Sequence, residues 1–504
     1  MFLTGVPLNE MFYRAVLNIL LVNPLYREGT NCTHDMFCAR TGYCSSVCKE
    51  GTVSVSPWLS FASRTQSSLA LLGSMCSHQS IGTHNSVITA SYGFGVEDCL
   101  YSMVLSASYL QFNEVRTISQ YYALTDQLNM GVRHLELDIH YFHGQFRMSH
   151  CGFSIGIVNY LFHLMENVLK WLNFKYDTDT IGCLPSFNGI PAEDQLLLRP
   201  VLEVVRQWME LPRNRDEILI LYLDTSVNLI RWKKVEELVS IFQSVFGSLI
   251  IPPQPDLDFR RLLVQKKRLM IVSRRVYPGA DFVFFSMDSA FTCHWKEQDI
   301  EKVCHSDGTV RRDRASLAGK SHQSVFYSRV VTNRLRYGPL SKDFLPSPSP
   351  VNIYDKNTLD LYALGFNTLA ADYIDEELAG SHIWTWSRDL EVAAIRDRLN
   401  ETCVAMEVGV PRWTVAACRE THRVLCRSAV NETDFVVGNY RSSPQLLIPL
   451  LHSAEKHTHV PVDECPFGYL FFPPISTYQQ RFAQAVVNGL VNGTVVWIGF
   501  RLEE

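Results

Sequence analysis

The chain has 504 residues, a hydrophobic content of 47% and a formal net charge of −5. This length exceeds one ordinary domain and is sufficient for a barrel of about 250 residues with additions on either side. The charge is unremarkable and no basic run or stripe is present, which argues against nucleic acid as a partner. No apolar stretch approaches the ~20 residues of a membrane span, so we expect any membrane contact to be peripheral.

Residues 1–65 are irregular and contain four of the chain's 14 cysteines: Cys32, Cys38, Cys44 and Cys48. We expect a segment stapled by disulfides. Zinc is the alternative, but the spacings lack the Cys-x-x-Cys pairs usual in structural zinc sites. Residues 11–22 make a poor secretory leader, and a short amphipathic helix or a truncated gene product is the alternative. We favour secretion.

Residues 66–395 alternate expected strands with expected helices, as parallel sheets require. The continuous apolar run before Asp224 is typical of a strand buried on both faces. Residues 153–190 exceed a normal crossover and predict an insertion over one end of the sheet. We predict strands at 79–83, 132–140, 145–150, 218–224, 268–273, 282–285, 368–372 and 383–386, and helices at 118–130 and 192–209.

The strand predicted at residues 132–140 has an unusual pattern. Side chains alternate between the two faces of a strand, so Glu136 and Asp138 share a face with His134, while apolar residues take the other. Unpaired buried charge costs several kcal/mol, so a cation or a polar substrate should lie against this face. A half-exposed strand edge is the simpler alternative.

Three motifs in this order resemble one family. They are GTHNS at residues 82–86, GVRHLELD at 131–138, and His150 at the end of the next expected strand. Together they resemble the catalytic domain of phosphatidylinositol-specific phospholipase C and its relatives, over residues 70–395. The resemblance implies an α/β fold, a distorted TIM (β/α)8-type barrel with cysteine-rich flanks. It also implies a phosphoric diester hydrolase that cleaves a phosphoinositide or glycosyl-phosphoinositide lipid at the glycerol–phosphate bond.

The resemblance implies two catalytic histidines. His84 would contact the phosphoryl group and stabilise its developing charge, and His150 would be the general acid for the leaving diacylglycerol oxygen. Imidazole suits proton transfer near neutral pH. Glu136 is a candidate for the base that activates the attacking hydroxyl.

The resemblance also implies a calcium site, because Asn85, Glu136 and Asp138 stand where calcium-dependent relatives have ligands. Asp224 stands where those relatives usually have glutamate, so its shorter side chain is a departure from their pattern. Carboxylate and amide oxygens are the donors that Ca²⁺ prefers.

Three further residues are candidates for substrate binding: Arg274, Asp372 and Trp386. Asp372 could match an aspartate that orients the catalytic histidine in metal-independent bacterial relatives. Those relatives place a basic side chain where the cation would sit, and Arg274 or Arg275 could take that place. Arg133 falls on the opposite face of its strand, and we expect it to be structural.

Residues 396–504 form the second cysteine-rich flank, with Cys403, Cys418, Cys426 and Cys465. They resemble the closing half of a C-type-lectin-like fold, and we expect a disulfide-stapled accessory domain with a glycan contact as an open interpretation. The four Asn-x-Thr sequons all lie in the two flanks, at Asn31, Asn400, Asn431 and Asn492. Cysteines and sequons together favour a secreted, lumenal or cell-surface glycoprotein.

Two alternatives stay open for the function. A glycerophosphodiesterase or sphingomyelinase-D-like hydrolase shares the Glu-x-Asp strand, although the GTHNS run argues against it. The second alternative is a catalytically silent barrel that serves as a surface binding protein. The presence of both His84 and His150 argues against it.

Overall fold

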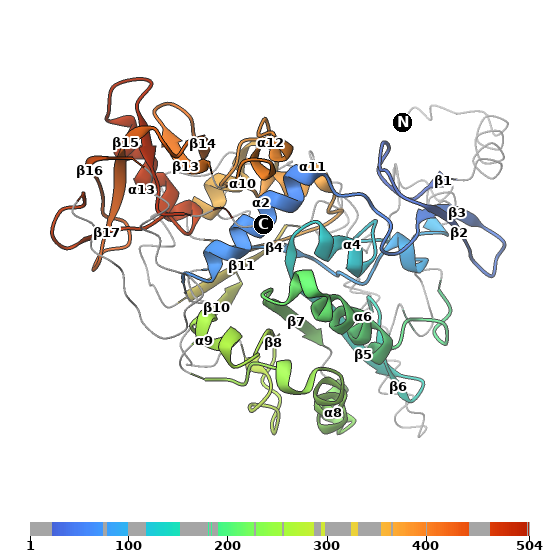
Figure 1. Ribbon diagram of the computed structural model, residues 1–504. Helices are drawn as coiled ribbons and strands as arrows, with labels where there is room; N and C mark the ends of the chain where they lie inside the picture. Colours follow the sequence, from blue (N-terminus) through green and yellow to red (C-terminus); the bar gives the residue numbers. More distant parts are fainter. Residues whose placement is uncertain are drawn as a thin grey trace, which may run out of the picture.

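The computed structural model describes most of the chain in three parts (Figure 1). An N-terminal three-stranded sheet, a central parallel sheet with helices, and a C-terminal, mainly antiparallel sheet follow one another in the sequence. The described residues are 23–73, 78–98, 117–151, 180, 183, 190–225, 228–254, 257–286, 294–297, 324–330, 354–363, 366–399, 401–442, 464–500 and 502.

The central sheet contains eight mutually parallel strands in the order β10-β11-β12-β4-β5-β7-β8-β9. This order is a cyclic permutation of the order along the chain, as in a barrel. Within the described residues no pairing joins β9 to β10, so the sheet is an arc whose closure is not described. The strands are β4 (Ser80–Thr83), β5 (Val132–Phe142), β7 (Leu219–Thr225), β8 (Leu269–Ser273), β9 (Phe285–Ser286), β10 (His294–Glu297), β11 (Ser324–Val330) and β12 (Thr368–Ala371).

The predicted α/β class and the parallel sheet are confirmed, but one predicted barrel strand runs antiparallel and another does not form. The segment at 145–150 forms β6 (Gln145–Met148), which returns antiparallel to β5 as a hairpin. The turn residues His143 and Gly144 have φ of 49° and 72°, and two successive positive values are typical of a tight hairpin turn. The segment at 383–386 forms no strand; β10 and β11, which the sequence pattern did not indicate, take part in the sheet instead.

Helices cover one face of the central sheet. Leu135, Leu137 and Leu221 belong to the apolar cluster on this face, together with Val205 of α6 and Phe242 of α8. The helix predicted at 192–209 begins only at Leu198, because the two residues before it pair with β6. The carbonyl of Leu196 accepts a hydrogen bond from the backbone nitrogen of Met148, and Leu197 forms a β-bridge with Arg147. The helices are α2 (Pro57–Ala70), α4 (Leu124–Asn129), α6 (Leu198–Glu210), α7 (Asn228–Arg231), α8 (Val235–Phe246), α9 (Phe259–Val264), α10 (Tyr354–Ala363), α11 (Glu376–Ser381), α12 (Val392–Arg396) and α13 (Thr477–Asn488), with short 3-10 turns η2 (Ala90–Tyr92), η4 (Pro212–Asn214) and η5 (Gly247–Leu249).

Arg133 lies on the helix-covered face and has a structural role. Its guanidinium makes two parallel hydrogen bonds to Glu217, of 2.7 and 2.8 Å, and lies 4.9 Å from the ring centroid of Trp208. A bidentate arginine–carboxylate pair fixes both partners, which suits a buried ion pair. The prediction that Arg133 is structural is confirmed.

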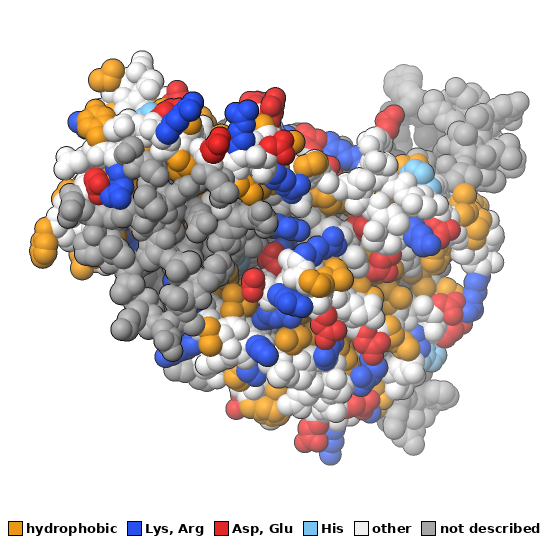
Figure 2. All heavy atoms as spheres, viewed as in Figure 1, with side chains coloured by type: hydrophobic (Ala, Val, Ile, Leu, Met, Phe, Trp, Pro, Cys, Tyr) orange, Lys and Arg blue, Asp and Glu red, His pale blue; other side chains and the backbone are white. Residues whose placement is uncertain are grey.

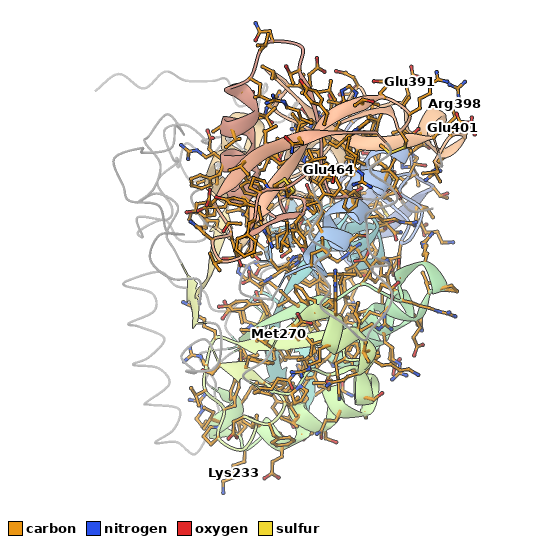
Figure 3. The ribbon with its side chains drawn as sticks, turned by 60° about the vertical axis from the view of Figure 1, so that its left-hand side comes forward. Lys233, Met270, Glu391, Arg398, Glu401 and Glu464 are labelled. Carbon is orange, nitrogen blue, oxygen red and sulfur yellow. A yellow bond between two sulfur atoms is a disulfide. The ribbon has the colours of Figure 1, made fainter. Side chains whose placement is uncertain are left out.

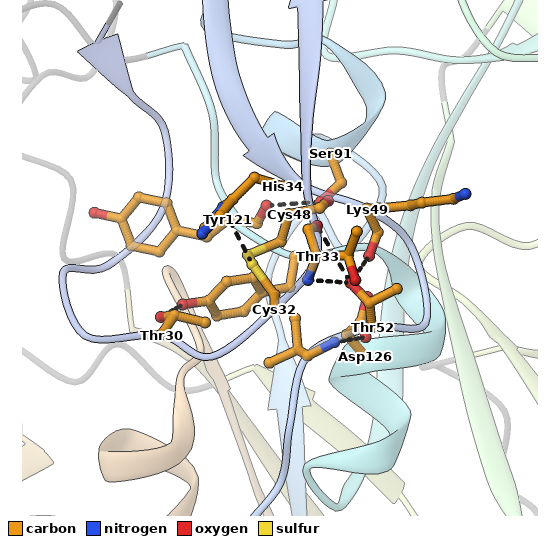
Figure 4. Close-up of a disulfide and its surroundings, with 12 residues drawn as sticks. Thr30, Cys32, Thr33, His34, Cys48, Lys49, Thr52, Ser91, Tyr121 and Asp126 are labelled. Carbon is orange, nitrogen blue, oxygen red and sulfur yellow. Dashed lines mark hydrogen bonds between the residues drawn. A yellow bond between two sulfur atoms is a disulfide. The ribbon is translucent and has the colours of Figure 1, made fainter.

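The N-terminal sheet consists of β1 (Asn23–Pro24), β2 (His34–Cys38) and β3 (Cys44–Cys48). Disulfides join Cys32 to Cys48 and Cys38 to Cys44, so the predicted bridges are present. The first bridge lies beside His34, whose Nδ1 is 3.6 Å from the Sγ of Cys32 (Figure 4).

The boundary expected at residue 65 falls inside α2, and α2 packs on the central part. The indole nitrogen of Trp58 donates to the carbonyl of Ser387 at 2.6 Å, and that of Trp386 donates to the hydroxyl of Thr65 at 2.8 Å. The N-terminal segment is attached just before this helix, where the backbone nitrogens of Gly51 and Val53 donate to the Asp126 carboxylate at 2.9 and 3.0 Å.

The C-terminal part is a six-stranded sheet with one long helix, α13. Disulfides join Cys403 to Cys418 and Cys426 to Cys465, as expected for a stapled domain. Buried tryptophans attach it to the central part, since Trp413 lies 5.5 Å from Trp384 between ring centroids. The strands are β13 (Thr402–Glu407), β14 (Thr414–Ala417), β15 (Thr421–Ser428), β16 (Phe435–Ser442), β17 (Tyr469–Phe471) and β18 (Val495–Trp497).

The carboxylate of Asp126 provides a pH test of how the N-terminal segment is attached. Burial raises the pKa of Asp126 from 3.8 to about 6. The folded state therefore binds the proton of the Asp126 carboxyl group more tightly than the unfolded state does. The protonated group contributes fully to stability below about pH 4, and this contribution is lost as the pH rises through about 6. We expect a loss on the order of 3 kcal/mol across this window.

Urea denaturation of the wild type and of Asp126→Asn between pH 4 and 7 measures this contribution by difference, because all other carboxylates are common to both proteins. The unfolding free energy of the wild type minus that of the variant should fall as the pH rises. Parallel curves would contradict the assignment.

Candidate active site

Three carboxylates meet where the middle of β5 pairs with the carboxyl end of β7. Glu136, Asp138 and Asp224 each offer an oxygen, and these oxygens lie within 4.8 Å of one another. The parallel register sets Asp138 opposite Asp224 and Glu136 opposite Tyr222, so all three acids share the face that the helices do not cover. Glu136 is fully buried, Asp138 is nearly so, and Asp224 is partly exposed. The structure thus brings together the three predicted acidic ligands.

His84 and Asp372 form a hydrogen-bonded pair at the neighbouring strand ends. Parallel pairing sets Thr83 of β4 opposite Ala371 of β12, which places the two following residues side by side. The Nδ1 of His84 lies 2.7 Å from the Oδ1 of Asp372. The Asp372 side chain is 1% exposed and that of His84 is 14% exposed, so a buried carboxylate orients an imidazole that solvent can reach. This arrangement fixes the tautomer and the direction of the His84 imidazole.

Gln120 holds these two strand ends together, and sequence reasoning did not identify it. Its amide nitrogen donates to the carbonyls of His84 and Ala371, both at 2.7 Å, and its Oε1 accepts from the backbone nitrogen of Ile374 at 3.0 Å. The side chain is fully buried. One residue therefore connects both halves of the histidine–aspartate pair, although nothing in the local pattern around residue 120 indicated it.

Asn85 lies in a tight turn directly after β4. Its φ is 43°, a left-handed value that asparagine tolerates better than most residues, and its side-chain amide donates to the hydroxyl of Ser119 at 3.2 Å. The turn is attached to β5, because the backbone nitrogen of Glu136 donates to the Ser86 hydroxyl at 2.9 Å. The side-chain nitrogen of Asn85 is thus engaged in a hydrogen bond, and its carbonyl oxygen is an acceptor by chemistry.

His150 follows the β5–β6 hairpin and is partly exposed. The preceding backbone nitrogen, of Ser149, donates to the carbonyl of Asp138 at 3.2 Å, which brings this segment to the acidic end of β5. A disulfide between Cys151 and Cys183 fixes the chain immediately after His150. This bridge lies in the central part, outside the two flanks; the insertion expected at 153–190 otherwise lies almost wholly outside the described residues.

The other two candidates for substrate binding have different positions. Arg274, directly after β8, places its NH1 3.5 Å from Oδ2 of Asp224, so it lies at the acidic cluster. Trp386 is fully buried and packs against Phe61 and Trp413, with ring centroids 5.5 and 5.6 Å apart. The prediction that Trp386 binds substrate is therefore wrong, because its ring fills the contact between the central and C-terminal parts.

His134 lies on the same face as the carboxylates but nearer the start of β5. Burial lowers its pKa to about 3, and its ring lies 5.9 Å from that of Tyr222 between centroids. Burial therefore favours the neutral imidazole of His134, which lies beneath the acidic cluster on the same face of β5.

No family model and no curated protein matches this chain. Solved structures do match, among them the phosphatidylinositol-specific phospholipase C of Listeria monocytogenes, at 15% identity and a TM-score of 0.37, over 64% of this chain and 98% of that chain. A structure of the S. aureus phosphatidylinositol-specific phospholipase C matches at 14% identity and a TM-score of 0.35, over 67% of this chain and 98% of that chain. At this level of similarity, the chemistry of the chain has to follow from its own residues.

Replacement of Asp372 tests the histidine–aspartate pair. Asp372→Asn keeps the size of the side chain but removes the negative charge that orients His84 and stabilises its protonated form, so we expect kcat to fall by about 10²- to 10⁴-fold. Kinetics on any substrate that the wild type turns over measure this fall, and a melting temperature near that of the wild type is the control. An unchanged kcat would show that the pair is only structural.

Proposed function

We propose that the chain is a phosphoric diester hydrolase that cleaves a phosphoinositide or glycosyl-phosphoinositide lipid in the manner of a phospholipase C. The observation that carries this proposal is the His84–Asp372 pair at the same end of the parallel sheet as Glu136, Asp138 and Asp224. An oriented imidazole beside a cluster of hard oxygen donors suits chemistry at a phosphate, where protons must be moved and negative charge must be neutralised.

The proposed reaction assigns one role to each group. The attacking hydroxyl of the inositol ring forms a bond to phosphorus and gives its proton to a base, for which Glu136 is the candidate. The bond from phosphorus to the glycerol oxygen breaks, and His150 gives a proton to that oxygen. His84, held by Asp372, donates to a phosphoryl oxygen and stabilises its growing charge.

The donor set fits a calcium ion. Three carboxylate oxygens lie within 4.8 Å of one another, and hard oxygen donors at such separations suit Ca²⁺ rather than a thiophilic metal. Glu136, Asp138 and Asp224 would hold the ion, with the amide oxygen of Asn85 as a further ligand. When bound, the ion would neutralise phosphate charge and lower the pKa of the attacking hydroxyl.

One contact favours a metal-independent alternative. The guanidinium of Arg274 lies 3.5 Å from Asp224, so a basic side chain already reaches the edge of the acidic cluster. In that mechanism Arg274 supplies the positive charge at the phosphate. It is half-exposed at 46%, which favours a role at the edge of the site over one at its centre.

Two observations support a secreted or cell-surface protein as part of this proposal. The described residues contain five disulfides, which form and persist in oxidising compartments. Asn31, Asn431 and Asn492 are exposed, as glycosylation requires. Among the described residues, no helix is both long and apolar enough to cross a membrane. A glycan contact of the C-terminal domain stays a prediction.

A panel of lipids labelled in the head group tests the proposal. Purified protein from a secretory host should release water-soluble phosphate from phosphatidylinositol or a glycosyl-phosphoinositide. Release of choline or free glycerol head groups instead would favour a sphingomyelinase-D-like or glycerophosphodiesterase activity. A protein that releases nothing from any lipid, with or without calcium, would favour the catalytically silent alternative.

The two histidines have separable roles. His84→Ala and His150→Ala should each lower turnover by about 10²- to 10⁴-fold and leave the melting temperature nearly unchanged, because both side chains are partly exposed. A substrate with a nitrophenyl leaving group needs no proton from an acid. His150→Ala should therefore impair cleavage of the lipid much more than of the nitrophenyl ester, whereas equal losses on both would remove His150 as the acid.

Calcium should bind and stabilise the folded protein, because three carboxylates so close together repel one another without a cation. We expect calcium to activate turnover and to raise the melting temperature, as any ligand of the folded state does. Asp224→Asn should weaken both effects, with activity restored at higher calcium, and Glu136→Gln should be more harmful. Full activity in excess chelator, with no calcium-dependent melting shift, would favour Arg274 as the source of charge.

A further inference from the structure

The residue that follows each member of the histidine–aspartate pair has a left-handed backbone. Asn85, which follows His84, has a φ of 43°. Tyr373, which follows Asp372, has a φ of 53°. Asparagine tolerates such values, but for a large side chain such as tyrosine they are uncommon and unfavourable. A backbone of this kind persists only where its surroundings hold it, so the contacts of Tyr373 have to stabilise the turn.

The left-handed turn at Tyr373 joins the chain after β12 to the segment 118–121. The backbone nitrogen of Tyr373 donates to the carbonyl of Ser119 at 2.8 Å, and that of Ile374 donates to Oε1 of Gln120 at 3.0 Å. Both bonds come directly after Asp372. The turn therefore fixes the chain on the carboxyl side of Asp372, as β12 fixes it on the amino side.

The side chain of Tyr373 contacts the same segment. Its hydroxyl donates to the carbonyl of Ile118 at 3.1 Å, and its ring centroid lies 5.0 Å from that of Tyr121. The ring also packs against an apolar cluster that contains Ile118, Phe94 and Val47 of β3. Tyr373 thus offsets the cost of its backbone conformation with contacts that a small side chain could not make.

The N-terminal sheet supports the aromatic partner of Tyr373. The hydroxyl of Ser91 lies within hydrogen-bond distance of the carbonyls of Cys48 and Tyr121, at 2.8 and 3.2 Å (Figure 4). Cys48 is joined to Cys32 by a disulfide. The stapled N-terminal segment is therefore connected to the residues that hold the turn after Asp372.

We propose that Tyr373 is a positioning residue, whose ring keeps the chain after β12 in the left-handed turn that directs Asp372 at His84. Without these contacts the backbone would relax toward the ordinary region, and the carboxylate would lose its fixed direction. Misplacement of a group by about 1 Å can cost about 100-fold in rate. As far as turnover is concerned, this role rests on the proposed function, whereas the geometry of the pair can be measured without it.

Two substitutions of Tyr373 separate its ring from its hydroxyl. Asparagine tolerates the left-handed backbone but lacks the ring, so Tyr373→Asn should lower kcat on a water-soluble inositol phosphodiester by about 10- to 100-fold and leave KM nearly unchanged. Tyr373→Phe loses only the bond to Ile118, and its kcat should stay within about fivefold of that of the wild type.

A double-mutant cycle shows whether Tyr373 acts through Asp372. In the Asp372→Asn background, Tyr373→Asn should lower kcat by about twofold or less, because the group that the ring directs is already lost. A residue that only stabilised the fold would lower kcat by the same factor in both backgrounds.

The imidazole of His84 provides a readout that needs no turnover. In protein labelled with isotopes at histidine, the Nδ1–H proton that is bonded to Asp372 should give a protected NMR signal, which His84→Ala lacks. Tyr373→Asn should speed the exchange of this proton with solvent by about tenfold or more, because the bond to the carboxylate opens more often.

Lys233→Asn is the matched control. The φ of Lys233 is 54°, close to that of Tyr373, but its side chain is exposed and projects from the lower edge of the molecule in Figure 3, beyond Met270 of β8. Basic and acidic side chains are intermixed on the face drawn in Figure 2, so the loss of one exposed lysine is a small change to the surface. This variant should leave kcat and the His84 signal unchanged.

The outcomes separate the two proposals. Faster exchange of the His84 proton in Tyr373→Asn, in a protein that cleaves no phosphodiester, would support the positioning role and overturn the proposed function. A wild-type exchange rate in Tyr373→Asn, equal losses of kcat in both backgrounds, or the same effects in Lys233→Asn would overturn the positioning role. If Tyr373→Asn does not fold, Tyr121→Leu removes the partner ring instead, and an unchanged exchange rate in that variant would also overturn it.

Discussion

The concentration of negative charge where β5 passes the carboxyl end of β7 is the constraint on which the rest of the site depends. Three carboxylates with oxygens within 4.8 Å of one another, two of them buried, repel strongly unless positive charge lies close by. Among the described residues, the guanidinium of Arg274 lies 3.5 Å from Asp224, the most exposed of the three, and is itself half-exposed. The proposed function therefore includes positive charge at this place, from a metal ion or from Arg274, and the two sources imply different mechanisms.

The histidine that completes the site depends on contacts between distant parts of the sequence. His84 and Asp372 are 288 residues apart, and they meet only because β12 pairs with β4. Gln120, in the segment between β4 and β5, then bonds both strand ends. The C-terminal domain adds support farther away, where Trp413 packs on Trp386. Loosening the pairing of β12 with β4 would thus misplace the imidazole before it affected the carboxylates.

Local pattern predicted the acidic strand well and predicted long-range partners poorly. Alternation along residues 132–140 was enough to place Glu136 and Asp138 on one face, because a strand's geometry repeats every two residues. The direction of β6 depended on one turn at His143 and Gly144, which was not recognised as a hairpin signal. Trp386 is buried by Trp413, which comes from another part of the chain. Gln120 bonds to backbone carbonyls, such as that of His84. Neither contact produces a pattern in the neighbouring sequence, so neither could be predicted from it.

The charge of the acidic cluster also determines how the proposed substrate could approach. A phosphodiester lipid is anionic and would be repelled by bare carboxylates. The guanidinium of Arg274 lies 3.5 Å from Asp224 and is half-exposed, so it is one source of positive charge at the edge of the cluster. A metal ion held among the carboxylates would be the other source. Salt would screen the exposed guanidinium far more than a buried ion, so the two sources differ in their dependence on ionic strength.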